Sequence, residues 1–179
     1  MPNLFLQLDG ITGESLDEFH ENEIELIGWN WQGGKEAAES ITNDAPYDIG
    51  QGKSRSANTK VGDITVTKRC DLASVTLAQY CALGTPIPSG VITCRKYAAL
   101  QGSGLEFVAY LVIKLNRVMI RSVHFDIQSG EKEGGEVTET VKLNFEQVEI
   151  EYLMQKNRGT PGGGVCFAWD IGKHKPPTG

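Results

Sequence analysis

The sequence predicts a mostly β protein that forms one domain with a single short α-helix. Apolar and polar residues alternate with a period of two over most of the chain, which is typical of strands with one buried face. Gly, Asn, Asp and Ser separate the alternating runs, and only one stretch has helical spacing. A chain of 179 residues favours one domain. About eight short strands joined by turns indicate a closed barrel or a sandwich.

The first strand is predicted at residues 4–8, where the leucines share one face and Asp9-Gly10 forms the following turn. Residues 24–31 form the second strand. Alternation divides its residues between two sides: Ile27, Trp29 and Trp31 on one, and Ile24, Leu26, Gly28 and Asn30 on the other.

Residues 33–62 are predicted to form one long loop. Their composition shifts to Gly, Ser, Asn, Asp and Lys, and the periodicity is lost. Loops of this length are uncommon unless they have a function or are disordered. Alternation returns at residues 63–68, where Ile64 and Val66 mark the buried face of a third strand.

Residues 71–83 are predicted to form the one helix. Asp71 or Ser74 caps its start, because a short oxygen side chain accepts hydrogen bonds from the free N–H groups there. Gly84 is a natural stop. Four small or apolar residues at helical spacing would pack against a sheet: Leu77, Ala78, Cys81 and Ala82.

The second half of the chain is predicted to contain five more strands and a tail. In the last two strands the apolar positions change from odd to even numbers, which requires a bulge or turn near Glu146-Gln147. Residues 1–155 then form the barrel domain, and residues 156–179 form a Gly/Pro-rich C-terminal tail. Residues 110–113 are apolar on both faces, which hints at self-association. The predicted strands are 90–96, 105–115, 118–127, 137–145 and 148–153.

Composition excludes several classes of partner. The net charge of −6 disfavours nucleic acid, whose phosphates require clustered Lys and Arg, and it disfavours an anionic membrane surface. No stretch approaches the length of a membrane-spanning helix, so membrane insertion is not expected. The N-terminus lacks the basic and long apolar regions of a signal peptide, so any export would follow a route that reads no such signal.

The sequence predicts neither an enzyme nor a cofactor. Its four cysteines form no Cys-x-x-Cys pair, which favours reduced, buried or half-buried thiols over zinc ligands or disulfides. The sequence has no Gly-x-Ser-x-Gly motif that would present a serine nucleophile to a histidine base. Its three histidines are His20, His124 and His174. Glu149 and Glu151 share a strand face that reads as solvated, and the glycine clusters lack the features of a phosphate loop.

The residues together resemble the Hcp (haemolysin-coregulated protein) family over nearly the whole chain. Five motifs occur in the family's order, and the fourth is the most specific, although Val75 stands where many members have Pro. They are Leu6 to Ser15 with the Gly-Glu-Ser turn, His20 to Trp31, Val66-Thr67-Lys68 with Asp71, Ser74 and Leu77, Val141 to Val148, and the glycine run before Trp169.

The resemblance implies a small closed antiparallel β-barrel with one flanking helix, assembled into hexameric rings. The rings would stack as the inner tube of a type VI secretion system, inside a sheath and beneath a spike protein, with effector proteins carried in the lumen. The subunit would be cytoplasmic before firing and secreted afterwards. Two other hypotheses remain: a monomeric β-barrel that binds a small ligand, and a hydrolase that uses His20 or His124.

The resemblance also suggests which residues make contacts in the tube. Asn30 would face the lumen and touch cargo, or else be an ordinary solvent-facing strand residue. The loop at 33–62 would reach the next ring, although its composition departs from the short glycine-rich insert of many members. The stacking residues in this loop would be Lys35, Glu36, Asp44, Tyr47 and Asp48.

Overall fold

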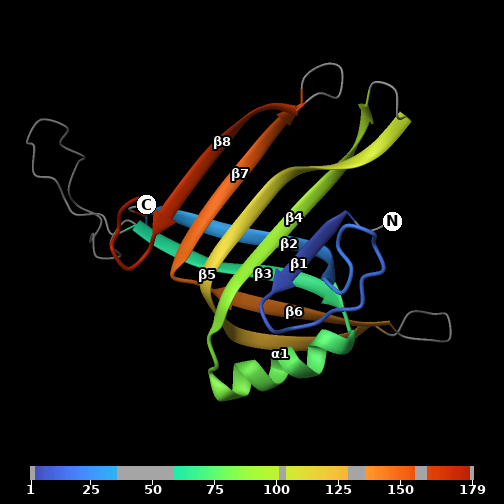
Figure 1. The fold of residues 1–179 in the computed structure, drawn as a ribbon. Helices are drawn as coiled ribbons and strands as arrows, with labels where there is room; N and C mark the ends of the chain where they lie inside the picture. The colour runs from blue at the N-terminus through green and yellow to red at the C-terminus, as the bar shows by residue number, and fades with distance from the viewer. Residues whose placement is uncertain (1–2, 36–58, 101–103, 129–135, 156–160, 178–179) are drawn as a thin grey trace, which may run out of the picture.

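A computed structural model describes residues 3–35, 59–100, 104–128, 136–155 and 161–177 (Figure 1). These residues form eight strands and one helix. In chain order the elements are β1 (Leu4–Leu8), β2 (Ile24–Lys35), β3 (Thr59–Arg69), α1 (Leu72–Leu83), β4 (Ile87–Leu100), β5 (Gly104–Gln128), β6 (Glu136–Asn144), β7 (Gln147–Gln155) and β8 (Pro161–Asp170).

Six antiparallel strands close into a barrel in the order β4-β1-β2-β3-β6-β5, because β5 pairs back with β4. From β5 the sheet continues outward through β7 to β8. The closed barrel with one flanking helix confirms the fold that the family resemblance implied and decides between the barrel and the sandwich that the strand pattern left open. Its interior holds the apolar residues of all six strands, including Leu6, Ile64, Ile92 and Leu143.

β5 is one strand of 25 residues, whereas the sequence predicted two strands at 105–115 and 118–127. Its first half pairs with β4 and β7, and its second half pairs with β6. Between the halves Arg117 has a φ of 50°, and the register shifts between Ile120 and Ser122. One left-handed residue and one bulge bend the strand from the outer sheet into the barrel wall without ending it.

A second irregularity changes which side chains of β2 face the core. The register with β3 shifts between Leu26 and Gly28, so one extra residue reverses the alternation. Ile24 and Leu26 are buried, and Trp29 also packs against the core. The prediction that the tryptophans and Ile24 lie on opposite sides is therefore wrong.

Helix α1 begins and ends as predicted. The Asp71 side chain accepts a hydrogen bond from Ala73 N at 2.9 Å, Ser74 Oγ accepts one from Asp71 N, and Gly84 ends the helix with a φ of 63°. The buried stripe differs from the prediction: it consists of Ala73, Ser74 and Leu77, whereas Ala82 is exposed. Within the described residues, no helix is long and apolar enough to cross a membrane.

Two predicted boundaries need correction. Part of the predicted tail at 156–179 is β8, which pairs with β7 from Gln147↔Asp170 onward. Its proline lies at the strand start, where a missing N–H is tolerated. The predicted loop at 33–62 is shorter, because β2 continues to Lys35 and β3 begins at Thr59; residues 36–58 lie outside the described residues. By contrast, the turn predicted near Glu146 is confirmed between β6 and β7.

The four cysteines are free thiols. Cys94 is buried and Cys81 is half-buried, in line with the prediction for them. Cys70 and Cys166 are exposed, contrary to that prediction, because one follows the end of β3 and the other lies on the edge strand β8.

A buried ionic network joins the barrel to the helix. Lys68 and Glu139 have fully buried side chains, and Lys68 Nζ donates to Glu139 Oε1 at 2.5 Å. The same ammonium donates to Asp71 Oδ1 at 2.6 Å and to Ser74 Oγ at 3.1 Å. A buried charge is tolerated only when it is paired and hydrogen-bonded. The network therefore ties β3, β6 and the cap of α1 together.

Replacing the buried ammonium should destabilise the fold strongly. Lys68→Met leaves Glu139 and Asp71 without their cation, so we expect the free energy of unfolding to fall by about 3–5 kcal/mol. Urea denaturation measures this loss. Lys114→Met is the matched control, because Lys114 pairs with Glu149 on the exposed surface and should cost at most about 1 kcal/mol. Equal losses in the two variants would contradict the role assigned to Lys68.

Candidate functional site

Four strands of the barrel form a wall with a polar outer face: β2, β3, β6 and the second half of β5. Along β3, Ile64, Val66 and Lys68 are buried, whereas Thr65 and Thr67 are half-buried on the opposite face. The same alternation continues in β6. We call this outward surface the polar wall.

Strand register arranges the polar wall in rows that cross all four strands. Apart from Lys142 and His124, the residues in these rows are small and uncharged. The first row is Asn30, Thr65, Lys142 and Ser122, and the second is Gly28, Thr67, Thr140 and His124. Beside the first row, Asn144 Nδ2 donates to Asp63 Oδ1 at 2.8 Å. Such a surface can donate and accept hydrogen bonds without a deep binding cleft.

The polar wall has open edges at both sides. β2 pairs with β1 only at Ile24 and Glu25, so within the described residues its outer edge has no partner strand over residues 26–35. At the other side, residues 119–128 of β5 pair with β6 alone within the same part of the chain. Open strand edges carry unpaired N–H and C=O groups that favour pairing with another chain.

Helix α1 flanks the wall beside β5 and carries an exposed apolar stripe. Leu72, Val75 and Leu83 are 59%, 78% and 69% exposed. Their spacing of three or four residues, with Gln79 between them, places them on one face, opposite the buried Leu77. We call them the α1 stripe. A helix that is apolar on both faces is typical of one that a partner covers.

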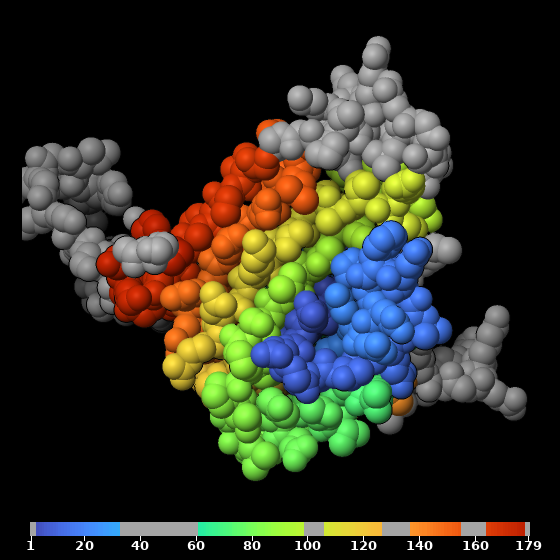
Figure 2. Space-filling view, in the orientation of Figure 1, coloured from blue at the N-terminus to red at the C-terminus, as the bar shows by residue number. Residues whose placement is uncertain are grey.

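A second exposed apolar surface lies on the β7–β8 extension, across the barrel from α1 (Figures 1 and 2). Tyr152 opposes Val165, and Ile150 opposes Phe167, so these side chains share one face. Val165 is 62% exposed and Phe167 is 49% exposed. We call this the β8 face. Apolar surface of this kind on a folded domain marks an interaction site.

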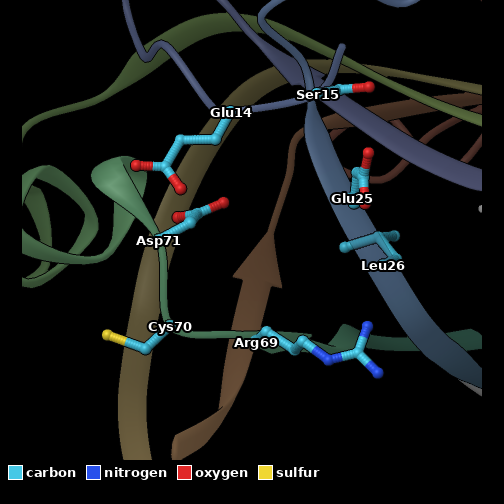
Figure 3. A pocket seen from close by; sticks show the side chains of 7 residues that line it. All are labelled: Glu14, Ser15, Glu25, Leu26, Arg69, Cys70 and Asp71. Carbon is cyan, nitrogen blue, oxygen red and sulfur yellow. The ribbon is translucent and has the colours of Figure 1, made fainter. Parts of the chain in front are cut away.

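A pocket of about 510 Å³ lies where the loop after β1, the start of β2, the end of β3 and the start of α1 come together. Figure 3 shows the side chains that line it. The Asp71 oxygen that caps the helix is already bound to Lys68. Among the described residues, no group of three or more His, Cys, Asp and Glu side chains could hold a metal ion. The pocket is lined by Glu14, Ser15, Glu25, Leu26, Arg69, Cys70 and Asp71.

The loop between β1 and β2 is joined to the barrel by an ion pair between Asp17 and Arg95 of β4. Both oxygens of Asp17 accept hydrogen bonds from Arg95, at 2.9 and 2.5 Å, and the guanidinium lies 4.5 Å from the Phe5 ring centroid and 5.0 Å from that of Phe107. The hydrogen bond from Arg95 is the main cause that lowers the pKa of Asp17. Gly13 is required in this loop, because a Cβ there would lie 2.3 Å from a backbone oxygen of Glu23.

The structure separates the three histidines. His20 bonds to Glu23 at 2.9 Å and stacks on Phe5, His124 lies on β5, and His174 follows β8. They do not share a site.

Asn30 is exposed on the polar wall, opposite to the tryptophans, where the sequence placed it. Of the predicted stacking residues, Lys35 is the last residue of β2, and Glu36, Asp44, Tyr47 and Asp48 lie outside the described residues. Sequence reasoning missed the α1 stripe.

Comparison with known proteins identifies the family. A family model described as type VI secretion system effector, Hcp, matches residues 5–152. The chain belongs to the Hcp family. It is 31% identical over 170 residues to Protein hcp1 of Pseudomonas aeruginosa, with 94% of each chain covered. Hcp1 from Salmonella typhimurium superposes with a TM-score of 0.72 at 28% identity, covering 97% of both chains. A structure titled as a type six secretion system protein has a TM-score of 0.80 at 24% identity, covering 99% of this chain and 100% of that one.

As a member of this family, the chain is a structural subunit of the type VI secretion tube, and its subunits form hexameric rings that stack and are secreted. The alternative of a monomeric ligand-binding barrel is not favoured. A tube subunit needs surfaces that contact its own copies, and the open strand edges, the α1 stripe and the β8 face are surfaces of that kind.

Stability should depend on the charge of Asp17 at acid pH. Because its pKa is lowered below the ordinary 3.8, the pairing with Arg95 stabilises the fold above that pH and is lost as the pH falls through the lowered value. Asp17→Asn removes this dependence. Thermal unfolding should therefore show the variant to be less stable than the parent at pH 6, with a gap that closes below about pH 4. A gap of constant size would contradict this assignment.

Proposed function

We propose that the rings close by side-to-side contact in which the polar wall lines the lumen. The observation that carries this proposal is the wall itself: a four-stranded sheet with a polar outer face and an open edge at each side. A wall of this kind becomes continuous when the β2 edge of one subunit lies beside the β5 edge of the next.

Strand direction supports this arrangement. Each neighbouring pair in the order β2-β3-β6-β5 is antiparallel, so β2 and β5 run in opposite directions. A rotation about the ring axis places β2 of the next copy beside β5, and the antiparallel alternation continues. The two edges are different surfaces of one subunit, which is the heterologous contact that ring closure requires.

The outer layer would close by an apolar contact. α1 lies on the β5 side of the barrel and the β8 face lies on the other side (Figure 1). The same rotation that joins the strand edges therefore turns the α1 stripe toward the β8 face of the neighbour. Burying an exposed Leu, Val or Phe side chain contributes about 1.5–3 kcal/mol, so a few such side chains on each surface can stabilise the contact.

We also propose the finer roles that the family resemblance suggests. Asn30 would face the lumen, and the segment at 33–62 would reach the adjacent ring. The subunit would be cytoplasmic before firing, would meet a spike protein and a sheath, and would carry effector proteins in the lumen. The role is structural, and we propose no catalytic step.

Charge on the β8 face should prevent ring formation. Phe167→Lys places a cation in the proposed apolar contact, so size-exclusion chromatography with light scattering should show monomers in place of hexamers. Cys166→Lys is the matched control, since Cys166 is also exposed on β8, next in sequence, and opposes Glu151 on the other face. This control should remain hexameric. Loss of hexamers in both variants, or in neither, would place the contact elsewhere.

A mixing experiment tests whether the two surfaces meet. Val75→Glu on the α1 stripe should also give monomers by itself. When the Val75→Glu and Phe167→Lys chains are mixed in equal amounts, they can form an alternating ring. Each contact in that ring either pairs the introduced glutamate with the introduced lysine or is unchanged from the parent, so hexamers should return. Light scattering of the mixture measures this recovery. A mixture that stays monomeric would show that these two positions do not face one another.

A further inference from the structure

The loop between β1 and β2 presents two large apolar side chains at its tip. Leu16 is 94% exposed and Phe19 is 78% exposed, and no large apolar side chain among the described residues is more exposed than Leu16. Backbone hydrogen bonds close the loop behind them, because Ser15 N donates to Glu23 O at 3.0 Å and Asn22 N donates to Ser15 O at 2.9 Å. Apolar side chains exposed together on a folded domain mark a contact surface.

The same loop is acidic, and we call residues 14–23 the acidic loop. Two guanidiniums lie near its carboxylates: Arg95 pairs with Asp17, and Arg69 lines the pocket that also contains Glu14. His20 bonds to Glu23. The five carboxylates outnumber these guanidiniums, so the surface around Leu16 and Phe19 has a net negative charge. The carboxylates are those of Glu14, Asp17, Glu18, Glu21 and Glu23. Three of them are exposed without an ion-pair partner among the described residues: Glu14, Glu18 and Glu21.

The turn formed by residues 171–177 lies at the opposite end of the barrel (Figure 1). The acidic loop leads into β2 at Ile24, beside the end of β3. The turn follows β8 and is bonded to the connection between β6 and β7, since Ile171 N donates to Glu146 O at 2.9 Å. β6 ends beside the first half of β3, so the loop and the turn lie at the two ends of the wall strands.

This turn is basic, and we call it the basic turn. It contains two exposed lysines, two exposed prolines and no carboxylate. The acids that adjoin it are compensated: Asp170 is buried and pairs with Lys173 at 3.3 Å, and Glu146 pairs with Arg117 at 3.2 Å. Lys175 has no ion-pair partner within the part of the chain that the structure describes. These groups together have a net positive charge, beside the apolar rings of the prolines.

We propose that the acidic loop of one ring binds the basic turn of a second copy in the adjacent ring, with Leu16 and Phe19 as the apolar centre of the contact. This inference rests on the proposed function, because strands joined edge to edge run along the tube and their two ends then face the rings on either side. Two different surfaces meet at each boundary, so all rings point in one direction. Contact between two acidic loops would bring like charges together, which is unfavourable.

Engineered disulfides test which surfaces meet. The background is Cys70→Ser with Cys166→Ser, which removes the exposed native thiols. Glu18→Cys and Lys175→Cys are then combined in one chain. Oxidised hexamers should give a ladder of covalent dimers, trimers and longer species in non-reducing gel electrophoresis, because each subunit can bond to one subunit above and one below. The ladder should form more slowly in about 1 M salt, where charge attraction is screened.

Phe19→Lys in the same chain tests the apolar centre. It places a cation against the basic turn, so the yield of the ladder should fall by about tenfold or more. Light scattering should still show hexamers, because the loop lies outside the proposed contact between subunits of one ring. Phe19→Tyr keeps the ring of the side chain and should retain the ladder. Equal ladder yields from Phe19→Lys and its parent would remove Phe19 from the contact and overturn the inference.

The matched control replaces Lys175→Cys by Lys114→Cys, since Lys114 is an exposed lysine of the outer sheet. This control should give no ladder, and a ladder of equal yield would count against the inference. Dimers from Glu18→Cys alone would show that loop meets loop, and hexamers with both cysteines but no ladder would show that loop and turn do not meet. Either result overturns the inference and leaves ring closure intact. A parent chain that forms no hexamers would instead overturn the proposed function.

Discussion

The buried ammonium of Lys68 is the contact that holds the polar wall and helix α1 together. It lies inside the barrel on β3, pairs with Glu139 of β6, and reaches the cap of α1 through Asp71 and Ser74. The wall and the helix are thereby held in one fixed relation. Since β3 and β6 are the central strands of the polar wall, the same pair also fixes the wall's shape. In the proposed ring the wall and the helix each meet a neighbour, so an error in that relation would be repeated around the whole ring.

The sequence predicted the fold class and the helix well, because period-two alternation and the capping residues Asp71 and Gly84 act locally. It predicted the details of β2 and β5 less well. A single bulge after Leu26 reverses the alternation, and a left-handed Arg117 bends a strand that local composition divides in two. Both features depend on pairing with distant strands. β8 was missed because glycines favour a loop locally, while pairing with β7 decides the outcome.

The functional surfaces were harder to predict than the fold. Alternation alone placed Asn30 on the face opposite the tryptophans, but it could not distinguish a solvated surface from the proposed lumen. The α1 stripe was missed for a related reason. A helix with apolar residues on both faces has weak amphipathic spacing, so the spacing did not show which face packs on the barrel. The buried face is Ala73, Ser74 and Leu77, of which only Leu77 was predicted. The exposure of Val75 and Phe167 is explained by the proposed contact with a second copy of the chain. The hydrophobic pattern of one chain does not show where a second copy binds.

The single continuous β5 has a mechanical consequence. It belongs to the outer sheet through β4 and β7 and to the polar wall, the proposed inner layer of the tube, through β6. A force that pushes the tube forward therefore passes from one layer to the other along covalent backbone, and not only across side-chain contacts. Slippage of the inner layer against the outer one would require stretching that backbone at Arg117. A tube built from such subunits resists shear between its layers even when the contacts between subunits are weak.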